Sequence, residues 1–223
     1  TTATATLSGN GTYIVTVTDS HGCTDTAMAT IAQPTLLTAT ITSTTNVSCY
    51  NGNNGAATVL ANGGTPGYAY SWNTTPAQTT ATATGLTAGT KTVTVTDSKG
   101  CTYQVSANIT QPTALIASTS STTNVDCNGN KSGVATVSVN GGTPGYTYTW
   151  NTVPAQTTPA ATGLGAGYYI VTVLDAHGCS DTATATITQP TALSAIPTTV
   201  DVGCFGGSNG HAGVTVSGGT PTY

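Results

Sequence analysis

The sequence predicts an all-β protein made of tandem antiparallel β-sandwich modules of about 78 residues each. Three observations support this prediction: long segments recur at a fixed spacing, Thr and Val alternate along short runs, and Gly, Asn and Pro separate those runs. Apolar residues do not recur at the 3.6-residue spacing of an amphipathic helix. We therefore expect strands and turns throughout.

The repeat is visible in two segments. "IVTVTDSHGC" begins at residue 14 and returns with small changes at residues 92 and 170, a spacing of 78. "NVSCYNGNNG" begins at residue 46 and returns at residues 124 and 201, the last step being one residue shorter. These spacings predict the C-terminal part of a module, two complete modules and the N-terminal part of another: 1–33, 34–111, 112–189 and 190–223.

One module shows the order of its elements. In residues 113–190 we predict strands at "TALIASTSS", "VATVSVN", "YTYTW", "YYIVTVLD" and "CSDTATATIT", and a long connection with one short edge strand after "YTYTW". Short strands with turns at such intervals, and a tryptophan on the third strand, are typical of an immunoglobulin-like (Ig-like) sandwich. We expect Trp72 and Trp150 to lie in the core.

The composition argues against several classes of function. Charged residues make up 4% of the chain, all of them Lys or Asp, against about 25% in ordinary globular domains. Nucleic-acid binding requires a basic surface, which this sequence lacks. Residues for acid–base catalysis and for metal ligation are few, and no apolar run reaches the length of a membrane span. We predict no enzyme, no metal and no cofactor.

One segment carries the residue types of a thiol nucleophile with its base. Asp175, His177 and Cys179 stand within five positions in "LDAHGC". The other two copies read "TDSHGC" and "TDSKGC", so Lys99 takes the place of the histidine while aspartate and glycine remain. A tight turn needs that aspartate and glycine. We interpret the segment as a turn and predict no catalytic residue.

The repeated motifs resemble a known family. "NVSCYNGNNGAATV", "GGTPGYAYSW" and "TVTVTDSKGC" are similar to the SprB-type repeat, named for a gliding-motility adhesin of Bacteroidota. The resemblance covers both complete modules and both partial ones. It implies an extracellular or cell-surface protein, secreted by the type IX system, with Ig-like non-enzymatic repeats.

Six cysteines in a chain that the resemblance places outside the cell indicate disulfides. On that resemblance, and because each full module owns two cysteines, pairing within modules comes first: Cys49–Cys101 and Cys127–Cys179. Cys23 and Cys204 would then pair outside the chain, or with each other between molecules. Two alternatives stay open. One is a pair between modules, such as Cys49 with Cys179; the other joins neighbours at each junction, as Cys23–Cys49, Cys101–Cys127 and Cys179–Cys204.

The surface offers candidate modification and binding sites. An uncharged repeat protein has little charge repulsion to keep it soluble, and covalent glycans would supply solubility. "DTA" and N-x-S/T motifs provide candidate glycosylation sites at Thr26, Thr182, Asn10, Asn46, Asn73 and Asn108. The rows Tyr68, Tyr70, Trp72 and Tyr146, Tyr148, Trp150 could instead stack on a surface polysaccharide.

These observations predict a non-enzymatic structural repeat protein that acts as an adhesin, a stalk or a fibre-forming polymer. Its expected partners are neighbouring modules or copies of itself, arranged head to tail. The partial modules leave two possibilities: the sequence is a window of a longer array, or the two parts complete each other between molecules. The alternative function is a glycan- or surface-binding module that uses the Tyr/Trp strand or the loops.

Overall fold

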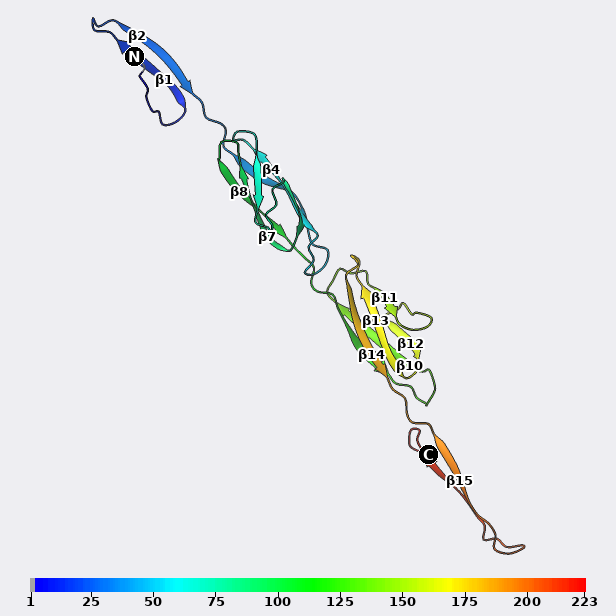
Figure 1. Ribbon diagram of the computed structural model, residues 1–223. Helices are drawn as coiled ribbons and strands as arrows, with labels where there is room; N and C mark the ends of the chain where they lie inside the picture. Colours follow the sequence, from blue (N-terminus) through cyan, green and yellow to red (C-terminus); the bar gives the residue numbers. More distant parts are fainter. Residues whose placement is uncertain (1–2) are drawn as a thin grey trace. The chain divides into compact units, whose positions relative to one another are not determined.

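The computed structural model describes residues 3–223, and every regular element in that range is a β-strand (Figure 1). The strands are β1 (Gly11–Thr18), β2 (Thr24–Ile31), β3 (Thr38–Thr45), β4 (Gly55–Asn62), β5 (Ala69–Trp72), β6 (Thr82–Leu86), β7 (Gly89–Thr96), β8 (Thr102–Ile109), β9 (Ile116–Thr123), β10 (Gly133–Asn140), β11 (Thr147–Trp150), β12 (Ala160–Leu164), β13 (Gly167–Leu174), β14 (Ser180–Ile187), β15 (Ser194–Val200) and β16 (His211–Ser217). Neighbouring strands pair antiparallel in every sheet. No helix in the described range is long and apolar enough to cross a membrane.

Contacts divide the chain into two compact units. The first takes in the chain up to Asn46 together with Asn53–Thr110. The second joins the short loop Val47–Gly52 to Gln111–Tyr223. The loop therefore belongs to the second unit although it lies inside the first complete repeat of the sequence.

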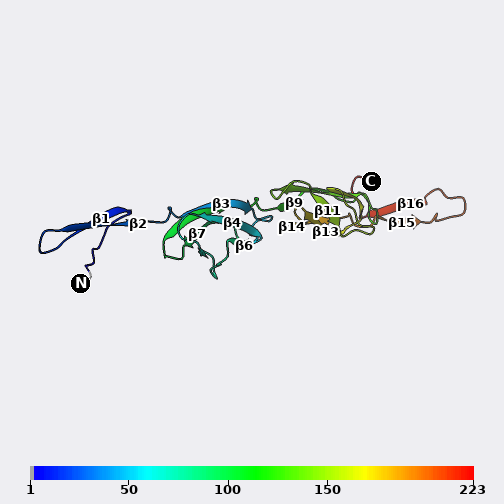
Figure 2. The same ribbon diagram turned by 90° about the horizontal axis from the view of Figure 1, so that it is seen from above.

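The first unit contains a sandwich of two three-stranded sheets (Figure 2). One sheet has the order β3-β4-β6 and the other β5-β7-β8, and contacts between β3 and β8 close the sandwich. Along β7, Val93 and Val95 are fully buried, while the threonines that alternate with them, Thr92, Thr94 and Thr96, are partly exposed. This alternation places one face of each strand in the core and the other toward solvent.

The second unit repeats the same plan. Its sheets have the orders β12-β10-β9 and β11-β13-β14, and β9 packs against β14. Trp150 is 1% exposed, and Val171 and Val173 of β13 are fully buried beside it. The prediction of an all-β chain with Ig-like antiparallel sandwiches is confirmed.

Two further pairs of strands form hairpins, β1-β2 in the first unit and β15-β16 in the second. The register of β1-β2 matches that of β13-β14, since Tyr13 faces Ala29 as Tyr169 faces Ala185. The pair β15-β16 lacks the register shift found in the equivalent pairs β3-β4 and β9-β10. Each hairpin has only two strands, and its apolar side chains, such as Ile14 and Val214, are exposed. A two-stranded hairpin has no second sheet to bury an apolar face.

Candidate functional site: a disulfide beside an aspartate turn

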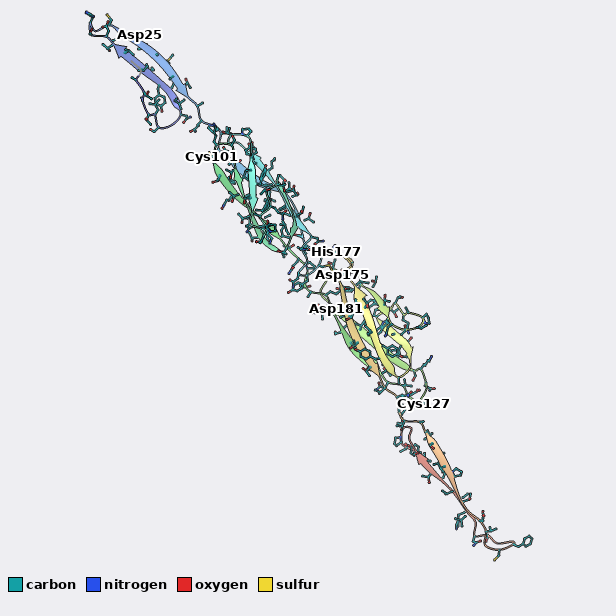
Figure 3. The ribbon with its side chains drawn as sticks, viewed as in Figure 1. Asp25, Cys101, Cys127, Asp175, His177 and Asp181 are labelled. Carbon is teal, nitrogen blue, oxygen red and sulfur yellow. A yellow bond between two sulfur atoms is a disulfide. The ribbon has the colours of Figure 1, made fainter. Side chains whose placement is uncertain are left out.

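The turn between β13 and β14 is organised by one carboxylate. Asp175 is buried, and its Oδ1 atom accepts the backbone N–H groups of His177 and Cys179, both at 2.9 Å. Gly178 takes a φ of +79°, a conformation that glycine adopts without steric cost. Asp175 and His177 therefore lie together at one end of the sandwich (Figure 3). The carboxylate fixes the position of Cys179.

The second oxygen of Asp175 holds a distant turn. Oδ2 accepts the backbone N–H of Thr143 at 2.8 Å, across 32 residues of sequence. That N–H belongs to the "GGTPG" turn before β11, where Gly141 and Gly142 both have positive φ. The aspartate thus joins two turns at the same end of the sandwich.

The first complete repeat contains the same arrangement. Asp97 accepts the N–H groups of Lys99 and Cys101 through Oδ1, and that of Thr65 through Oδ2. Asp19, in the hairpin β1-β2, accepts the corresponding N–H groups of the turn alone. The aspartate is therefore a structural element of each repeat.

These hydrogen bonds change the acidity of the buried carboxyls. At Asp97 the Thr65 N–H is the largest influence, and with the turn N–H groups it outweighs burial and lowers the pKa. At Asp175 burial opposes the charge, but the N–H groups of Thr143, Cys179 and His177 and the His177 charge together lower the pKa. Both groups are thus stabilised in the ionised form.

Cys179, at the end of this turn, is bonded to Cys49. Their Cα atoms lie 5.7 Å apart, and 130 positions separate them in the sequence. Both belong to the second unit, Cys49 through the loop Val47–Gly52. By the boundaries predicted from the sequence, however, Cys49 belongs to the repeat 34–111 and Cys179 to the repeat 112–189. The disulfide therefore links two successive repeats of the sequence.

The pairing corrects the expectation that cysteines bond within modules. Cys49 does not pair with Cys101, nor Cys127 with Cys179, and Cys101 and Cys127 are exposed free thiols. The reason is geometric. The loop before β4 and the turn before β8 lie at opposite ends of one sandwich, because β4, β7 and β8 run its length between them. Of the alternatives, the pair between modules is the one present. Cys23 and Cys204 are also free and exposed.

Contacts other than the disulfide also hold the loop that carries Cys49. The backbone N–H of Asn51, which has a φ of +57°, donates to Oε1 of Gln111 at 2.8 Å. The Sγ atom of Cys179 lies 3.5 Å from the carbonyl oxygen of Ser48. The loop is thus fixed both by the disulfide and by contacts of its backbone groups at Asn51 and Ser48.

The equivalent loop around Cys127 is ordered by Asp126. Its Oδ1 atom accepts the Ser132 hydroxyl, the Asn130 amide and the Cys127 N–H. With Ser132 as the largest influence, these bonds lower the pKa of Asp126. The loop presents the Cys127 thiol to solvent without a sulfur partner.

The side chains of the three residues that resembled a catalytic group form their hydrogen bonds and their disulfide with other groups. His177 uses Nδ1 to contact the Thr143 hydroxyl at 2.9 Å, Asp175 binds backbone N–H groups, and the Cys179 sulfur is in a disulfide. A sulfur in a disulfide has no thiolate to attack a substrate. In the described range, no three His, Cys, Asp or Glu side chains gather as metal ligands would.

The aromatic rows serve the core and the turns. Trp72 and Trp150 are both 1% exposed, and each indole N–H donates to a backbone carbonyl at 3.0 Å. The hydroxyls of Tyr68 and Tyr146 donate to the carbonyls of Gly63 and Gly141 at 2.6 Å. The tyrosines of both rows are partly exposed, so stacking on a sugar stays a prediction.

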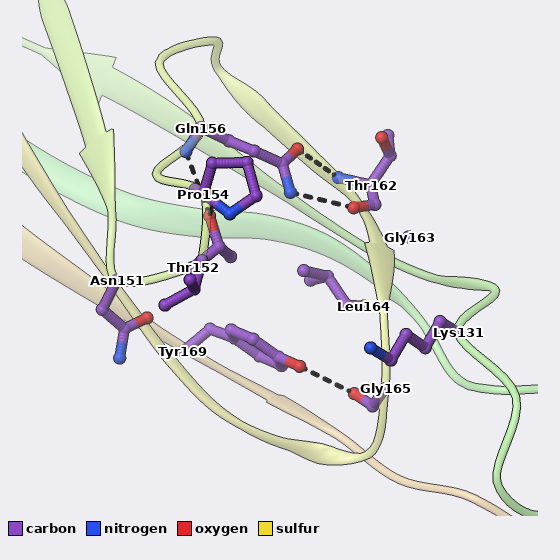
Figure 4. Close-up of a pocket in the computed structure, with 11 residues that line it drawn as sticks. Lys131, Asn151, Thr152, Pro154, Gln156, Thr162, Gly163, Leu164, Gly165 and Tyr169 are labelled. Atoms are coloured by element: carbon purple, nitrogen blue, oxygen red, sulfur yellow. Dashed lines mark hydrogen bonds between the residues drawn. The ribbon is translucent and has the colours of Figure 1, made fainter.

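A hollow of about 480 Å³ lies beside the loop between β11 and β12 (Figure 4). Gln156 spans it, donating to the carbonyl of Thr162 and accepting the N–H of the same residue. Tyr169 donates its hydroxyl to the Gly165 carbonyl. A similar hollow in the first repeat has Lys91 where Tyr169 stands. Because Gln156 and Tyr169 bond to backbone groups of the hollow's own lining, we interpret these two side chains as supports that hold the loop in place.

The candidate glycosylation sites are all exposed. Thr26 and Thr182 lie on β2 and β14, facing solvent. Asn10, Asn73 and Asn108 are exposed as well, and so is Asn46, whose Oδ1 accepts the N–H of Thr110 at 3.0 Å. Exposure permits attachment of a glycan at each position, and glycosylation stays a prediction.

Sequence reasoning missed the glutamines. Gln111 and Gln189 each accept an N–H from a cysteine loop, and Gln78 and Gln156 each brace a loop. The signal was present, because these glutamines recur at the repeat spacing in "QPT" and "AQTT".

Comparison with solved structures returned distant similarities. They include the N-terminal eight Ig domains of Down syndrome cell adhesion molecule isoform 1.30.30 (16% identity, 80% of this chain and 30% of that one, TM-score 0.32). The C-terminal 282-residue fragment of intimin, solved with the intimin-binding domain of its translocated receptor, is 19% identical over 74% of this chain and 67% of that one, with a TM-score of 0.32. A tetra-tandem repeat from the extending region of a large adhesion protein is 18% identical, covering 93% of this chain and 70% of that one, with a TM-score of 0.27.

Comparison with curated protein sequences returned no match. The model of one family matches in three places, at residues 41–76, 119–155 and 196–223. Each match includes a cysteine loop, and the first two also include the "GGTPG" turn and the buried tryptophan. The resemblance noted from the motifs is thereby confirmed, because the family whose model matches in these three places is the SprB repeat.

Proposed function

We propose that this chain is a non-enzymatic extracellular repeat protein that carries mechanical load, as an adhesin, a stalk or a fibre. The observation that supports the proposal most directly is the bond between Cys49 and Cys179. It connects successive repeats covalently, in addition to the peptide chain.

The bond determines which residues feel a pulling force. Tension that enters before Cys49 and leaves after Cys179 passes through the sulfur atoms, so residues 50–178 lie outside the load path. In the chain-entropy account, closing a loop of 130 residues stabilises the folded state by about 5 kcal/mol. The enclosed segment contains both complete sandwiches except their outermost strands β3 and β14.

The SprB repeat and the disulfide, which oxidising environments preserve, both support an extracellular setting. With 4% charged residues, the surface depends on hydroxyl and amide groups for its hydration. Glycans on Thr26, Thr182 or the exposed asparagines would add to that hydration. Attachment to a surface polysaccharide remains the alternative role for the loops.

Single-molecule pulling on the whole chain tests the proposal. Without reductant, unfolding should release the length of the residues outside 50–178 only. With reductant, or in the Cys49→Ser/Cys179→Ser variant, about 450 Å more should be released, at about 3.5 Å for each of the 130 positions. Cys101→Ser/Cys127→Ser is the matched control and should behave as the parent chain. Equal release with and without reductant would contradict the load-bearing role.

A further inference from the structure

The six cysteines fall into two classes defined by their place in the repeat. The loop cysteines, Cys49, Cys127 and Cys204, follow "NV" or "DV" with one residue between. The turn cysteines, Cys23, Cys101 and Cys179, end the aspartate turn. The one disulfide in the described range joins a loop cysteine to the turn cysteine of the next repeat. Two free cysteines of each class remain.

The loops of Cys49 and Cys127 each donate a backbone hydrogen bond to a glutamine side chain. Gln111 accepts the N–H of Asn51 from the loop of Cys49, and Gln189 accepts the N–H of Gly129 from the loop of Cys127. Gln33 stands at the same position of the repeat. Its side chain is exposed and has no hydrogen-bond partner among residues 3–223. Gln33 is therefore a glutamine acceptor to which no cysteine loop of the described residues is bonded.

The surface around Cys101 contains counterparts of the residues that receive Cys49, with a leucine, Leu36, where the other surface has Ala114. Around Cys179, a hollow is lined by Ala114, Leu115, Gly178 and Ser180 together with Cys49 and Tyr50 of the incoming loop. Around Cys101, a hollow of about 360 Å³ is lined by Leu36, Leu37, Gly64, Cys101, Thr102 and Tyr103, with Gln33 and Pro34 at its side. Leu36 is 80% exposed there. No loop from the described residues enters this hollow.

The loop of Cys127 corresponds to the loop of Cys49, which is the inserted part of the contact at Cys179. Gly129 and Asn128 already bind Gln189 and the carbonyl of Pro190, at the start of the next repeat. Cys127 lies in a hollow with Leu193 and Gly219, the counterparts of Leu115 and Gly142. The loop thus occupies the position that the loop of Cys49 takes, with its thiol free.

We infer that Cys101 and Cys127 are half-sites of the cross-link seen at Cys49–Cys179. The hollow beside Cys101 receives the cysteine loop of another SprB repeat, and Cys127 bonds the turn cysteine of another. The partner repeat is supplied by a second copy of the chain, which carries free cysteines of both classes. The inference rests on the repeat geometry and not on the load-bearing role.

The bond forms by thiol–disulfide exchange with a small disulfide oxidant. The thiolate of Cys101 attacks the oxidant's sulfur–sulfur bond, releasing one small thiolate and leaving a mixed disulfide. The loop thiolate then attacks Cys101 Sγ, and the second small thiolate leaves. Two protein thiols lose two electrons and two protons in total, and the oxidant is reduced to two thiols.

Oxidation of the whole chain in a glutathione redox buffer tests the inference. Covalent dimers are separated without reduction, and the bonds between copies are assigned by peptide mass mapping. We expect bonds that join a loop cysteine, Cys127 or Cys204, to a turn cysteine, Cys23 or Cys101. Random collision would give same-class and mixed-class bonds equally often, because each class offers two free thiols.

A pair of variants tests whether the hollow must bind the incoming cysteine loop, or whether the reactivity of the Cys101 thiol alone is enough. Leu36→Asp places a charge in the hollow at an exposed position and should lower the yield of dimers through Cys101 several-fold. Leu60→Asp changes a leucine that is 59% exposed outside the hollow, and should leave that yield unchanged. Same-class bonds as frequent as mixed ones would overturn the inference. So would an absence of dimers through Cys101 while that thiol reacts with glutathione, or equal yields from the two leucine variants.

Discussion

The Oδ2 atom of Asp175 accepts the backbone N–H of Thr143 at 2.8 Å, and so joins the turn before β14 to the turn before β11. Asp97 and Thr65 form the same bond at 2.9 Å in the first repeat. The carboxylate also fixes Cys179, whose sulfur bonds Cys49. One buried charge therefore positions the cysteine that links successive repeats.

Replacing this carboxylate should destabilise the second sandwich. Asp175→Asn keeps one carbonyl oxygen, but its amide NH₂ faces backbone N–H groups that need an acceptor. We expect the Tm of that sandwich to fall by about 5 °C or more, measured by calorimetry. Asp201→Asn, at an exposed position, is the control and should leave both transitions in place.

Stability should depend on pH through the same carboxyls. The pKa values of Asp97, Asp126 and Asp175 are lowered from 3.8 in the folded chain. Their contribution is therefore fully present above pH 3.8 and is lost as the pH falls below that value toward the folded pKa. Thermal melts should give a flat Tm from neutral pH down to about pH 5 and a declining Tm below about pH 4. A Tm that rises on acidification would contradict this assignment.

The glycine turn beneath Asp175 should not tolerate a side chain. Gly142 has a φ of +62°, and a Cβ atom there would lie 2.9 Å from the Asp175 Oδ2 atom and 3.0 Å from Leu115. Gly142→Ala should cost at least about 1–2 kcal/mol of unfolding free energy from the backbone conformation alone. Chemical denaturation measures the loss. Gly165→Ala is the matched control, because a Cβ atom at Gly165 has no neighbour nearer than 3.8 Å.

The buried tryptophan should be a large contributor to stability. Trp150 is 1% exposed and packs against Val171, Val173 and Ala185. Trp150→Ala should destabilise the second sandwich by about 3–5 kcal/mol. Tryptophan fluorescence then reports Trp72 alone, and its unfolding transition should stay where it is in the parent chain. Tyr168→Ala, at a side chain 59% exposed, is the control for the second sandwich.

The sandwich could be predicted from the sequence because its signals are local and repeated. Alternating valines mark the buried face of β7 and β13, and the tryptophans mark the core. The aspartate turn was also predictable, since "D-x-x-G-C" recurs in all three copies. The second bond of Asp175 could not be read in this way. It joins residues 32 positions apart, and that proximity exists only once both sheets have formed.

The disulfide pairing could likewise be assigned only once the fold was known. Counting cysteines by module favours Cys49 with Cys101, because counting ignores where the strands carry each residue. Strands β4, β7 and β8 place the loop and the turn at opposite ends of the sandwich, so the turn at Cys179 of the next repeat is nearer to Cys49. The glutamines at 33, 111 and 189 recur as clearly as the cysteines do. Their role as acceptors emerges only when the loops are in place.

Mass mapping of the folded chain, digested without reduction and with free thiols blocked, tests the central claim most directly. We predict one cross-linked pair of peptides that carries Cys49 and Cys179, and blocked thiols at Cys101 and Cys127 in chains kept from further oxidation. Peptides that join Cys49 to Cys101 and Cys127 to Cys179 would show that each repeat is tied only to itself, and would contradict the account.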